Sequence, residues 1–279
     1  MPTEILGANL GHQRAAGAAS GVAMVHTAGA FTAFHRGTEY IDLIPRNFSG
    51  AAVARYALCP YLVILKADSA DDLAGTIADY SAIAQDGSTG TEVAVGGGGG
   101  LAIGRSFYIG SAIPFRGVYV DIDTANGSGS GAVTVYYWAG SWVDVSATDA
   151  TRTSHAFDTD NKTVTWTVPS AWQSSSLVKI DRSVNSSLHW RDVPMYWTKW
   201  TWNAVIAAGT TLDHMLGINE STAYAEVPSS LGTGMRIHHG FGSNGVAGVE
   251  TLTNAGTGNM LVTCSALNGY FSTGKLTTV

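Results

Sequence analysis

Apolar and polar residues alternate with a period of two through the middle of the chain. The alternation runs through residues 117–123, 132–138, 142–145 and 163–168. Successive side chains of a β-strand point to opposite faces of a sheet, so a strand with one buried face shows this pattern. Turn-forming residues (glycine, serine, asparagine, aspartate and proline) separate the four segments. We therefore predict an all-β fold, a compact antiparallel β-sandwich that is jelly-roll-like in architecture.

Less regular apolar runs predict the remaining elements. Further strands are expected at residues 39–44, 61–65, 91–95, 245–252 and 260–264. In residues 69–73 a serine is followed three residues later by an aspartate, a pattern that caps helices, and we expect a short helix there. Residues 212–218, with the sequence LDHMLGI, are expected to form a short helix or a loop.

The two ends of the chain differ from this middle region. Residues 1–60 contain few charges and few large apolar side chains, and their frequent glycines interrupt any helical pattern. Two alternatives are open: an extended arm on a neighbouring subunit, with Phe31 and Phe34 as contact candidates, or accessory strands of the same sandwich. We expect a tryptophan-rich sandwich at residues 61–206 and a small C-terminal β region at residues 207–279.

All eight tryptophans lie between residues 107 and 203. Aromatic side chains bury the largest areas per residue, and each Å2 of apolar area removed from water contributes about 25 cal/mol. We therefore expect Trp138, Trp142, Trp166 and Trp172 to anchor the core of the sandwich.

Three further tryptophans crowd one predicted strand at residues 197–202. Trp200 and Trp202 share one face of that strand, whereas Trp197 takes the other face. These indoles therefore do not all enter the same core. For Trp190, Trp200 and Trp202 three locations are open: the core or sandwich edge, a protein interface, or a platform that stacks on a sugar.

Composition narrows the class of protein. Charged residues make up 13% of the 279 residues and the formal net charge is -6, which excludes a charged disordered chain and argues against a non-specific nucleic-acid binder. The start of the chain lacks the basic region of a signal peptide, and residues 15–34 are too weakly apolar for a membrane span. Cys59 and Cys264 are expected to be buried thiols. We expect a soluble protein assembled inside a cell, without nucleic acid or membrane as partner.

Candidate chemistry is sparse. No histidine pair has helical metal spacing with a glutamate, and no Gly-x-Ser-x-Gly or cysteine–histidine signature occurs. Five glycines at residues 96–100 lack the Lys-Ser/Thr ending of a phosphate-binding loop. Asp121, Asp123 and Asn126 are the best metal candidates, because oxygen ligands on a turn suit Ca2+, and an ordinary acidic turn is the alternative. We expect no enzymatic activity, no catalytic residue, no bound metal and no cofactor.

Aromatic segments follow one another in a set order. They are residues 107–111 (FYIGS), Phe115, residues 137–142 (YWAGSW), 164–172 (VTWTVPSAW) and 195–197 (MYW). This order resembles a β-sandwich module of tailed-bacteriophage virion proteins, in which a YW-x-G-x-W turn leads through a DGT-like loop to W-x-x-P-x-x-W and an aromatic closing strand. The resemblance covers roughly residues 105–206. It departs from the module at residues 148–151 (TDAT), where a glycine is usual.

The resemblance implies a structural virion protein, and a capsid decoration or cement protein that stabilises the shell through subunit contacts is the first expectation. A neck, baseplate or tail-fibre component is the alternative, and a carbohydrate-binding module is a third. The expected partners are the major capsid protein or neck and tail proteins, together with further copies of the chain in a homo-oligomer such as a trimer. The expected location is the virion, assembled in the host cytoplasm.

Overall fold

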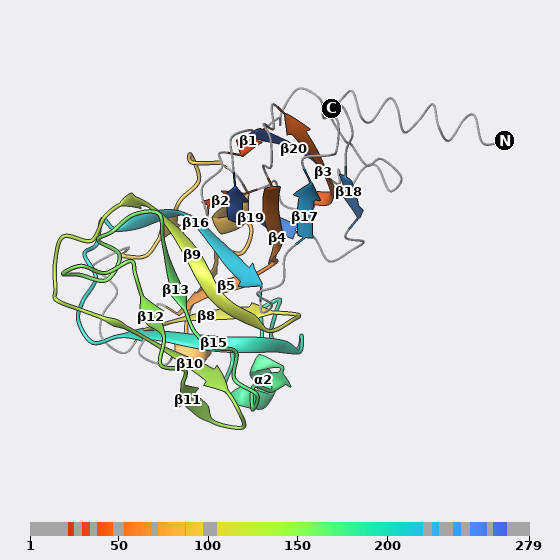
Figure 1. Ribbon diagram of the computed structural model, residues 1–279. Coiled ribbons are helices and arrows are strands. Elements are labelled where there is room, and N and C mark those ends of the chain that lie inside the picture. Colours follow the sequence, from red (N-terminus) through yellow and green to blue (C-terminus); the bar gives the residue numbers. More distant parts are fainter. Residues whose placement is uncertain are drawn as a thin grey trace. The chain divides into compact units, whose positions relative to one another are not determined.

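The strands of this protein pair in two separate groups (Figure 1). In the computed structural model the chain forms a central unit, Pro60–Glu220, and a terminal unit made of Met1–Cys59 and Ser221–Val279. The structure describes residues 22–24, 30–33, 38–46, 53–67, 72–86, 88–96, 105–219, 225–228, 237–240, 246–255 and 259–266, with side chains described at Phe31 and within 57–219. Strands dominate with almost no helix and pair in antiparallel sheets, which confirms the predicted all-β, sandwich-like class.

Two sheets build the central unit. Its elements in chain order are β5 (Val63–Ala67), η1 (Asp72–Ala74), β6 (Ile77–Asp79), η2 (Ile83–Gln85), β7 (Val93–Ala94), β8 (Ser106–Ser111), β9 (Phe115–Thr124), β10 (Val133–Trp138), β11 (Trp142–Asp144), β12 (Thr148–Asp149), β13 (Lys162–Thr165), β14 (Ser174–Ser175), α2 (Leu177–Ile180), β15 (Met195–Trp202) and β16 (Thr211–Asn219). A seven-stranded sheet has the order β11-β10-β15-β8-β5-β6, with β14 paired to β15 beside this path. A five-stranded sheet has the order β12-β13-β9-β16-β7.

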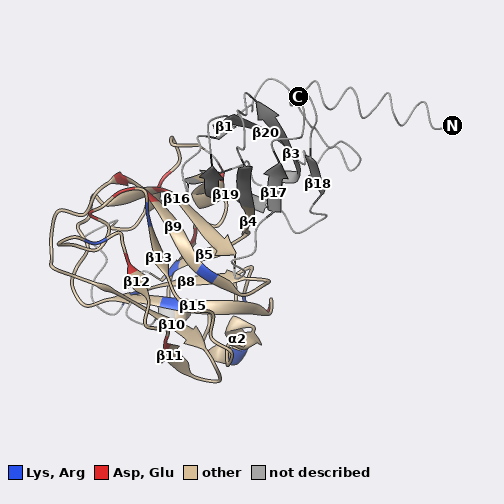
Figure 2. Ribbon diagram, in the orientation of Figure 1, with Lys and Arg blue, Asp and Glu red and all other residues tan. Residues whose placement is uncertain are grey.

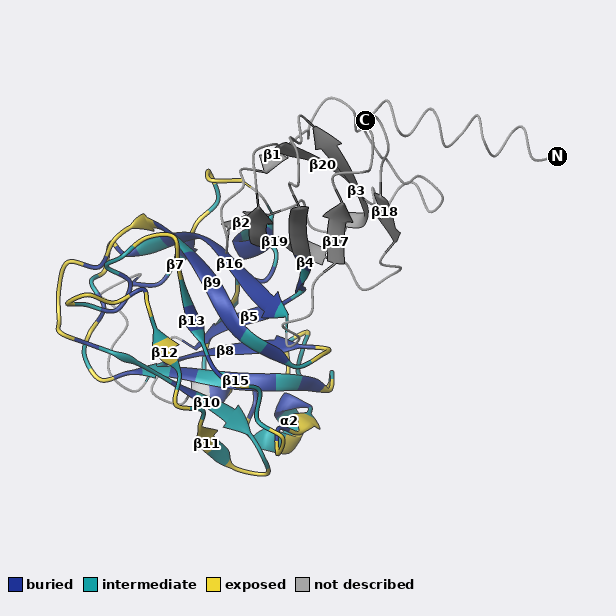
Figure 3. Ribbon diagram, in the orientation of Figure 1, coloured by how far each residue is buried: buried dark blue, intermediate teal, exposed yellow. Residues whose placement is uncertain are grey.

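The inner faces of these two sheets share one hydrophobic core. The seven-stranded sheet contributes Phe107 and Trp200, and the five-stranded sheet contributes Val120 and Met215, all of them fully buried. The alternation of the sequence explains this arrangement, because every second residue of β9 and β10 faces inward. Figure 3 shows the buried residues concentrated along β5, β8, β9, β15 and β16. The central unit is therefore a β-sandwich.

The outer face of the seven-stranded sheet carries a second core. Leu65, Tyr108 and Trp197 pack there against Leu177 of α2 and Val184 of the following loop. Strand β15 is thus buried on both faces, with Trp200 and Trp202 in the first core and Trp197 in the second. Backbone and indole approach closely here, since a Cβ atom added at Gly110 would lie 2.6 Å from Cε3 of Trp197. Glycine at position 110 is what lets the Trp197 ring lie flat on β8.

Strand β16 corrects the expectation of a short helix or loop at residues 212–218. This segment pairs along its length with β9, and its register shifts between Leu212 and His214. The shift is a β-bulge in which Asp213 has no residue opposite it. Because of the bulge, both Leu212 and Met215 enter the core although three positions separate them. The spacing resembles that of a helix, but it is the spacing of a bulged strand.

The terminal unit combines strands from both ends of the chain. Its strands are β1 (Val22–Met24), β2 (Ala30–Ala33), β3 (Thr38–Arg46), β4 (Val53–Pro60), β17 (Ala225–Pro228), β18 (Ile237–Gly240), β19 (Val246–Ala255) and β20 (Asn259–Ala266). They form two four-stranded sheets, β1-β20-β3-β18 and β17-β4-β19-β2. In each sheet every N-terminal strand is bonded to a C-terminal one.

This pairing changes the expected division of the chain. Of the two alternatives for residues 1–60, the segments that the structure describes take the strand form and pair within the chain. The sandwich expected at residues 61–206 extends further, since β16 is the neighbour of β9 in the five-stranded sheet. The rest of the expected C-terminal region, residues 207–279, joins the N-terminal strands instead of forming a separate region.

Candidate functional site

An aromatic turn closes the hairpin of β10 and β11. Trp138 lies directly opposite Trp142 in the strand register, and their rings meet edge to face with centroids 5.2 Å apart. The backbone N–H of Ala139 donates to the carbonyl of Ser141 at 3.0 Å, and Gly140 has φ of 88°. A positive φ strains residues that carry a Cβ atom, so this turn requires glycine. The turn therefore fixes the position of two indoles at the edge of the seven-stranded sheet.

The two indoles of this turn are only half-buried. Trp142 packs against the second core and against the ring of Tyr108, whose centroid is 5.8 Å away. Trp138 belongs to neither core of the central unit. The next residue of the edge strand, Val143, is 39% exposed. The expectation that Trp138 and Trp142 anchor the core is thus wrong for Trp138 and holds in part for Trp142.

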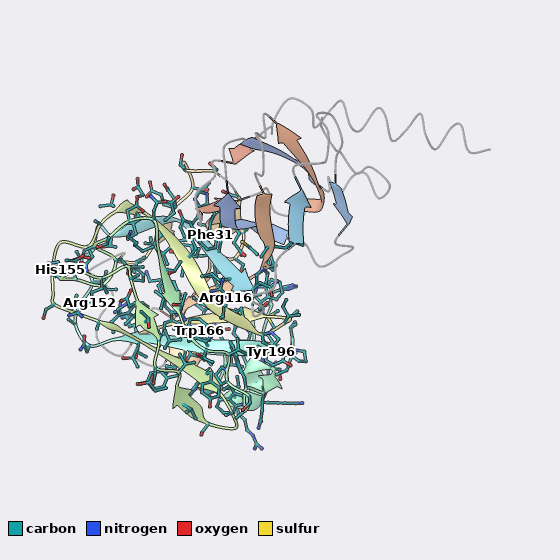
Figure 4. All side chains as sticks on the ribbon, in the orientation of Figure 1. Phe31, Arg116, Arg152, His155, Trp166 and Tyr196 are labelled. Carbon is teal, nitrogen blue, oxygen red and sulfur yellow. The ribbon has the colours of Figure 1, made fainter. Side chains whose placement is uncertain are left out.

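Trp166 and Trp172 lie in the first core, where they were expected. Each is 7% exposed, and both pack on the ring of Phe115, with centroids 5.4 and 5.2 Å away (Figure 4 labels Trp166). The indole N–H of Trp166 donates to the carbonyl of Phe115 at 3.0 Å, and that of Trp172 donates to the carbonyl of Trp197 at 3.1 Å. Both indoles therefore combine apolar burial with a satisfied polar group.

The other tryptophan candidates are placed differently from one another. Trp200 and Trp202, candidates for an exposed surface, are 0% and 3% exposed, so neither serves as a platform or an interface. Trp190 is half-buried, and its indole N–H donates to Oδ2 of Asp79 at 2.8 Å. The ring of His189 lies edge-on to Trp190 with centroids 5.0 Å apart. Of these three, Trp190 is the candidate that retains an accessible face.

The phenylalanine candidates lie in the terminal unit. Phe31 is half-buried on β2, opposite Glu250 of β19. Phe34 lies outside the residues that the structure describes. Cys59 is a buried thiol, as expected. The side chain of Cys264, on β20, lies outside the described side chains.

Side-chain hydrogen bonds hold the loops between β9 and β13. Asp158 accepts hydrogen bonds from the backbone N–H groups of Thr153, Ser154 and His155 at 2.6, 2.6 and 2.8 Å. Arg152, labelled with His155 in Figure 4, donates from Nε to the carbonyl of Gly131 at 3.1 Å. Burial alone would raise the pKa of Asp158, but the three backbone donors and Thr159 hold it well below its usual range.

Residues 148–151 (TDAT) form a tight turn. Thr151 donates from its backbone N–H and from its hydroxyl to Oδ1 of Asp149, at 2.9 and 2.6 Å. Burial raises the pKa of Asp149, while the bonds from Thr151 and the charge of Arg152 oppose the rise and Asp158 adds to it. The carboxylate of Asp149 thus closes the turn by accepting both hydrogen bonds.

The bulge of β16 gathers charged side chains on the outer face of the five-stranded sheet. Since Leu212 and Met215 face the core, Asp213 and His214 both face away from it. His214 lies opposite Asp121 in the register, with Nδ1 3.0 Å from Oδ2 of the carboxylate. Asp123 follows on the same face, and Glu92 directly precedes β7. We call Glu92, Asp121, Asp123, Asp213 and His214 the acidic bulge.

The acidic bulge contains fewer hydrogen-bond donors than hydrogen-bond acceptors. Asp123 Oδ2 accepts from the hydroxyls of Thr124 and Thr211 at 2.9 and 2.8 Å. Oδ1 of Asp213 and Nε2 of His214 are buried without a hydrogen-bond partner. Burial raises the pKa of Asp213, and repulsion from Asp121, Asp123 and Glu92 adds to the rise while His214 opposes it. The arrangement therefore concentrates negative charge where it is poorly compensated.

The calcium candidate is not assembled. The amide of Asn126 donates from Nδ2 to the carbonyl of Ala156 at 3.0 Å and accepts at Oδ1 from the N–H groups of Ala207 and Ser128 at 3.0 and 3.2 Å. Asn126 is 2% exposed, so it holds a loop and does not offer an oxygen to a cation at Asp121. Among the residues that the structure describes, no group of three or more His, Cys, Asp or Glu side chains could hold a metal ion.

The chain was compared with family models, curated proteins and solved structures, and none of them matched. The described part of the chain also contains no helix that is long and apolar enough to cross a membrane.

Proposed function

We propose that this protein is a structural component of a tailed-bacteriophage virion, and that it decorates or cements the capsid shell. The observation that carries the proposal is the spatial arrangement of the segments that resemble the phage module. Tyr137 contacts Trp172 with ring centroids 6.3 Å apart, and Trp172 contacts Trp166 at 6.5 Å and Tyr196 at 5.8 Å. Segments spread over sixty residues of sequence thus form one connected set of rings.

This ring network supports a structural role through its rigidity. Its members come from β10, from the segment after β13 and from β15, so the network links the two sheets of the central unit. Aromatic pairs in this geometry contribute about 0.5–1.5 kcal/mol each beyond the area that they bury. A sandwich braced in this way presents fixed surfaces, as a protein bound to a particle requires.

The edge of the seven-stranded sheet is the proposed contact surface. Strand β11 is the last strand of that sheet, and edge strands offer backbone groups to other chains. Exposed Val143 lies on β11, and half-buried Trp138 lies at the end of the adjacent strand β10. We propose that a neighbouring virion protein, either the major capsid protein or a neck or tail protein, covers them.

The other proposed roles have less structural support. A neck, baseplate or tail-fibre position requires the same fold and differs only in the partner, so location on the particle separates it from the decoration role. The carbohydrate-binding alternative relied on Trp200 or Trp202 as an exposed platform, and both are buried. We further propose that the chain assembles as a homo-oligomer, with a trimer as the first arrangement to test.

Cryo-electron microscopy of virions that carry this chain tests the proposal. Density for the sandwich on the outside of the capsid shell supports the decoration role, and density at the neck, baseplate or fibre assigns the alternative position. Absence of the chain from purified particles, measured by mass spectrometry, overturns the proposal. The mass of the purified protein, measured by native mass spectrometry, gives the number of copies in the oligomer.

A matched pair of variants tests the contact surface. Val143→Lys places a charge on the β11 edge and should reduce binding to particles that lack the protein by at least about tenfold, since burying an unpaired charge is costly. Val205→Lys makes the same change at a residue that is 45% exposed and lies outside the edge. Equal binding of the two variants would show that the β11 edge is not the contact.

A further inference from the structure

The acidic bulge lies directly beside a short pairing in the five-stranded sheet, that of β7 with β16. Strand β7 pairs with β16 only through Ala94 opposite Thr211 and Val93 opposite Leu212. Two more bonds extend this contact, from the N–H groups of Val95 and Gly96 to the carbonyl of Thr210, both at 3.1 Å. The bulge begins at the next residue, Asp213. Few hydrogen bonds therefore attach β7 to the sheet, and these bonds lie next to the acidic bulge.

Two buried polar atoms of the acidic bulge, one on Asp213 and one on His214, have no hydrogen-bond partner. Asp121 receives Nδ1 of His214, which leaves Nε2 of the same ring buried without a partner. Asp213 is 9% exposed, and its Oδ1 has no donor. Within the described residues no lysine or arginine forms an ion pair with a carboxylate of the cluster. Figure 2 shows acidic residues gathered at this end of β9 and β16.

Other charged or titratable groups surround the cluster on neighbouring elements. Asp86 ends η2, which packs against β16. Tyr119 of β9 shares the outer face, and Asp160 accepts the backbone N–H of Ile122 at 2.6 Å. Lys66 of β5 donates from Nζ to the carbonyl of Ala94 at 2.7 Å, so a cation binds β7 at a backbone oxygen. These neighbours are two carboxyl groups, one phenol and one lysine whose ammonium group binds a backbone oxygen.

We propose that the acidic bulge is a proton-sensitive latch for β7: the cluster takes up a proton as the pH falls from neutral into the acidic range, and this uptake strengthens the pairing of β7 with β16. A proton on one carboxyl removes a negative charge beside Glu92, which directly precedes β7. It also supplies a donor in a group that has unpaired acceptors. The proposal is independent of the virion role.

The direction of the effect follows from linkage. The pKa of Asp213 is raised in the folded protein, by burial first and then by repulsion from Asp121 and Asp123. A carboxyl with a raised pKa binds a proton more tightly in the folded state, so its contribution to stability is present below the ordinary aspartate pKa and is lost as the pH rises through the raised value. At neutral pH the ionised carboxylate opposes folding, and the pairing of β7 with β16 ends at Leu212, the residue before Asp213.

Hydrogen exchange on the full-length chain tests the latch. Protection of the Val95 and Gly96 amides, corrected for the intrinsic dependence of exchange on pH, should rise as the pH falls from about 7.5 to about 4, the ordinary range of an aspartate. Asp213→Asn should raise protection at about pH 7.5 by roughly fivefold, because it removes the charge and adds a donor, and should flatten the pH dependence. Protection of these amides that does not change with pH in the unmodified protein overturns the proposal.

Two further variants make the result specific. Asp192→Asn removes one negative charge at a side chain that is 73% exposed, and it should leave the pH dependence of Val95 and Gly96 unchanged. Asp123→Asn removes an exposed charge of the cluster and should shift protection in the same direction as Asp213→Asn, by less. If Asp213→Asn does not fold, Asp123→Asn still tests whether the acidic bulge controls the pairing of β7. An equal response to Asp192→Asn would mean that net charge, and not the acidic bulge, controls β7.

Discussion

The indole of Trp166 lies edge-on to the indole of Trp200, with ring centroids 6.3 Å apart and ring planes at 80°. Trp166 directly follows β13 of the five-stranded sheet, whereas Trp200 lies on β15 of the seven-stranded sheet. Their N–H groups donate to the carbonyl of Phe115 and to Oγ1 of Thr198, at 3.0 and 3.1 Å. This pair therefore joins the two sheets of the sandwich with both indole donors satisfied.

Replacing either indole of this pair should destabilise the central unit strongly. We expect Trp166→Ala and Trp200→Ala each to lower the free energy of unfolding by about 3–5 kcal/mol, the usual loss on emptying a large aromatic site. Urea denaturation measures the loss, and a double-mutant cycle should show a coupling energy of about 0.5–1.5 kcal/mol. Trp138→Ala is the control, because Trp138 is half-buried and belongs to neither core. Equal losses at positions 138 and 166 would contradict this assignment of the core.

The aromatic turn should depend on the backbone conformation of Gly140. An added Cβ atom at Gly140 or at Gly127 meets no heavy atom within 4 Å, but only Gly140 of these two has a positive φ, at 88°. Gly140→Ala should therefore lower the melting temperature through a strain of roughly 1–2 kcal/mol. Gly127→Ala should be neutral or slightly stabilising, because it restricts the unfolded chain. The prediction fails if calorimetry gives the same change for both variants.

Asp158 should make the stability of the central unit sensitive to acid. Although burial alone would raise its pKa, backbone donors hold the pKa of Asp158 well below the usual range. A carboxyl with a lowered pKa contributes stability above its ordinary value and loses it as the pH falls toward the folded value. Because solvent screens this partly exposed carboxylate, Asp158→Ala should cost only about 1 kcal/mol at neutral pH, and the cost should shrink below about pH 4. Urea denaturation across this pH range measures the difference, and a cost that is constant with pH would show that the carboxylate charge is not involved.

Removal of divalent cations should leave the protein unchanged. The amide oxygen of Asn126 is occupied by two backbone N–H groups, and Asp121 pairs with His214, so these side chains are engaged within the fold. We expect the same melting temperature with and without EDTA. A drop with EDTA that Ca2+ restores, and that Asp123→Asn abolishes, would identify Asp121 and Asp123 as ligands after all.

Several features of the fold follow from short-range sequence patterns. The alternation at residues 117–123 and 132–138 predicted β9 and β10, because alternate residues of each strand pack into the first core. These residues are Val118, Val120 and Ile122 of β9 and Val133, Val135 and Tyr137 of β10. Trp166 and Trp172 were identifiable as core residues, because large aromatic side chains gain the most from burial. The glycine of the YWAGSW turn was equally recognisable, because a turn between two paired strands needs a positive φ.

The candidate sites were not predictable in the same way, because burial of a residue depends on what covers its face. Trp200 and Trp197 point to opposite faces of β15, and the sequence alone does not decide which of those faces is covered. In the structure α2 and the loop after it cover the second face, so both indoles are buried. The acidic bulge was missed because β16 has helical spacing of its apolar residues, and only the register with β9 reveals the extra residue at Asp213.

The sequence by itself determined the period of each regular strand and the residues that must be apolar, since these are set by neighbours within a few positions along the chain. Only the tertiary structure decided which strands became neighbours. Strand β3 lies beside β20, with Ile44 opposite Leu261, and this pairing joins the two ends of the chain into one unit. Backbone hydrogen bonds between strands are the same for any pair of residues, so local composition carries no record of the partner. The partner is selected by the burial that the whole chain achieves, and that is a property of the folded molecule.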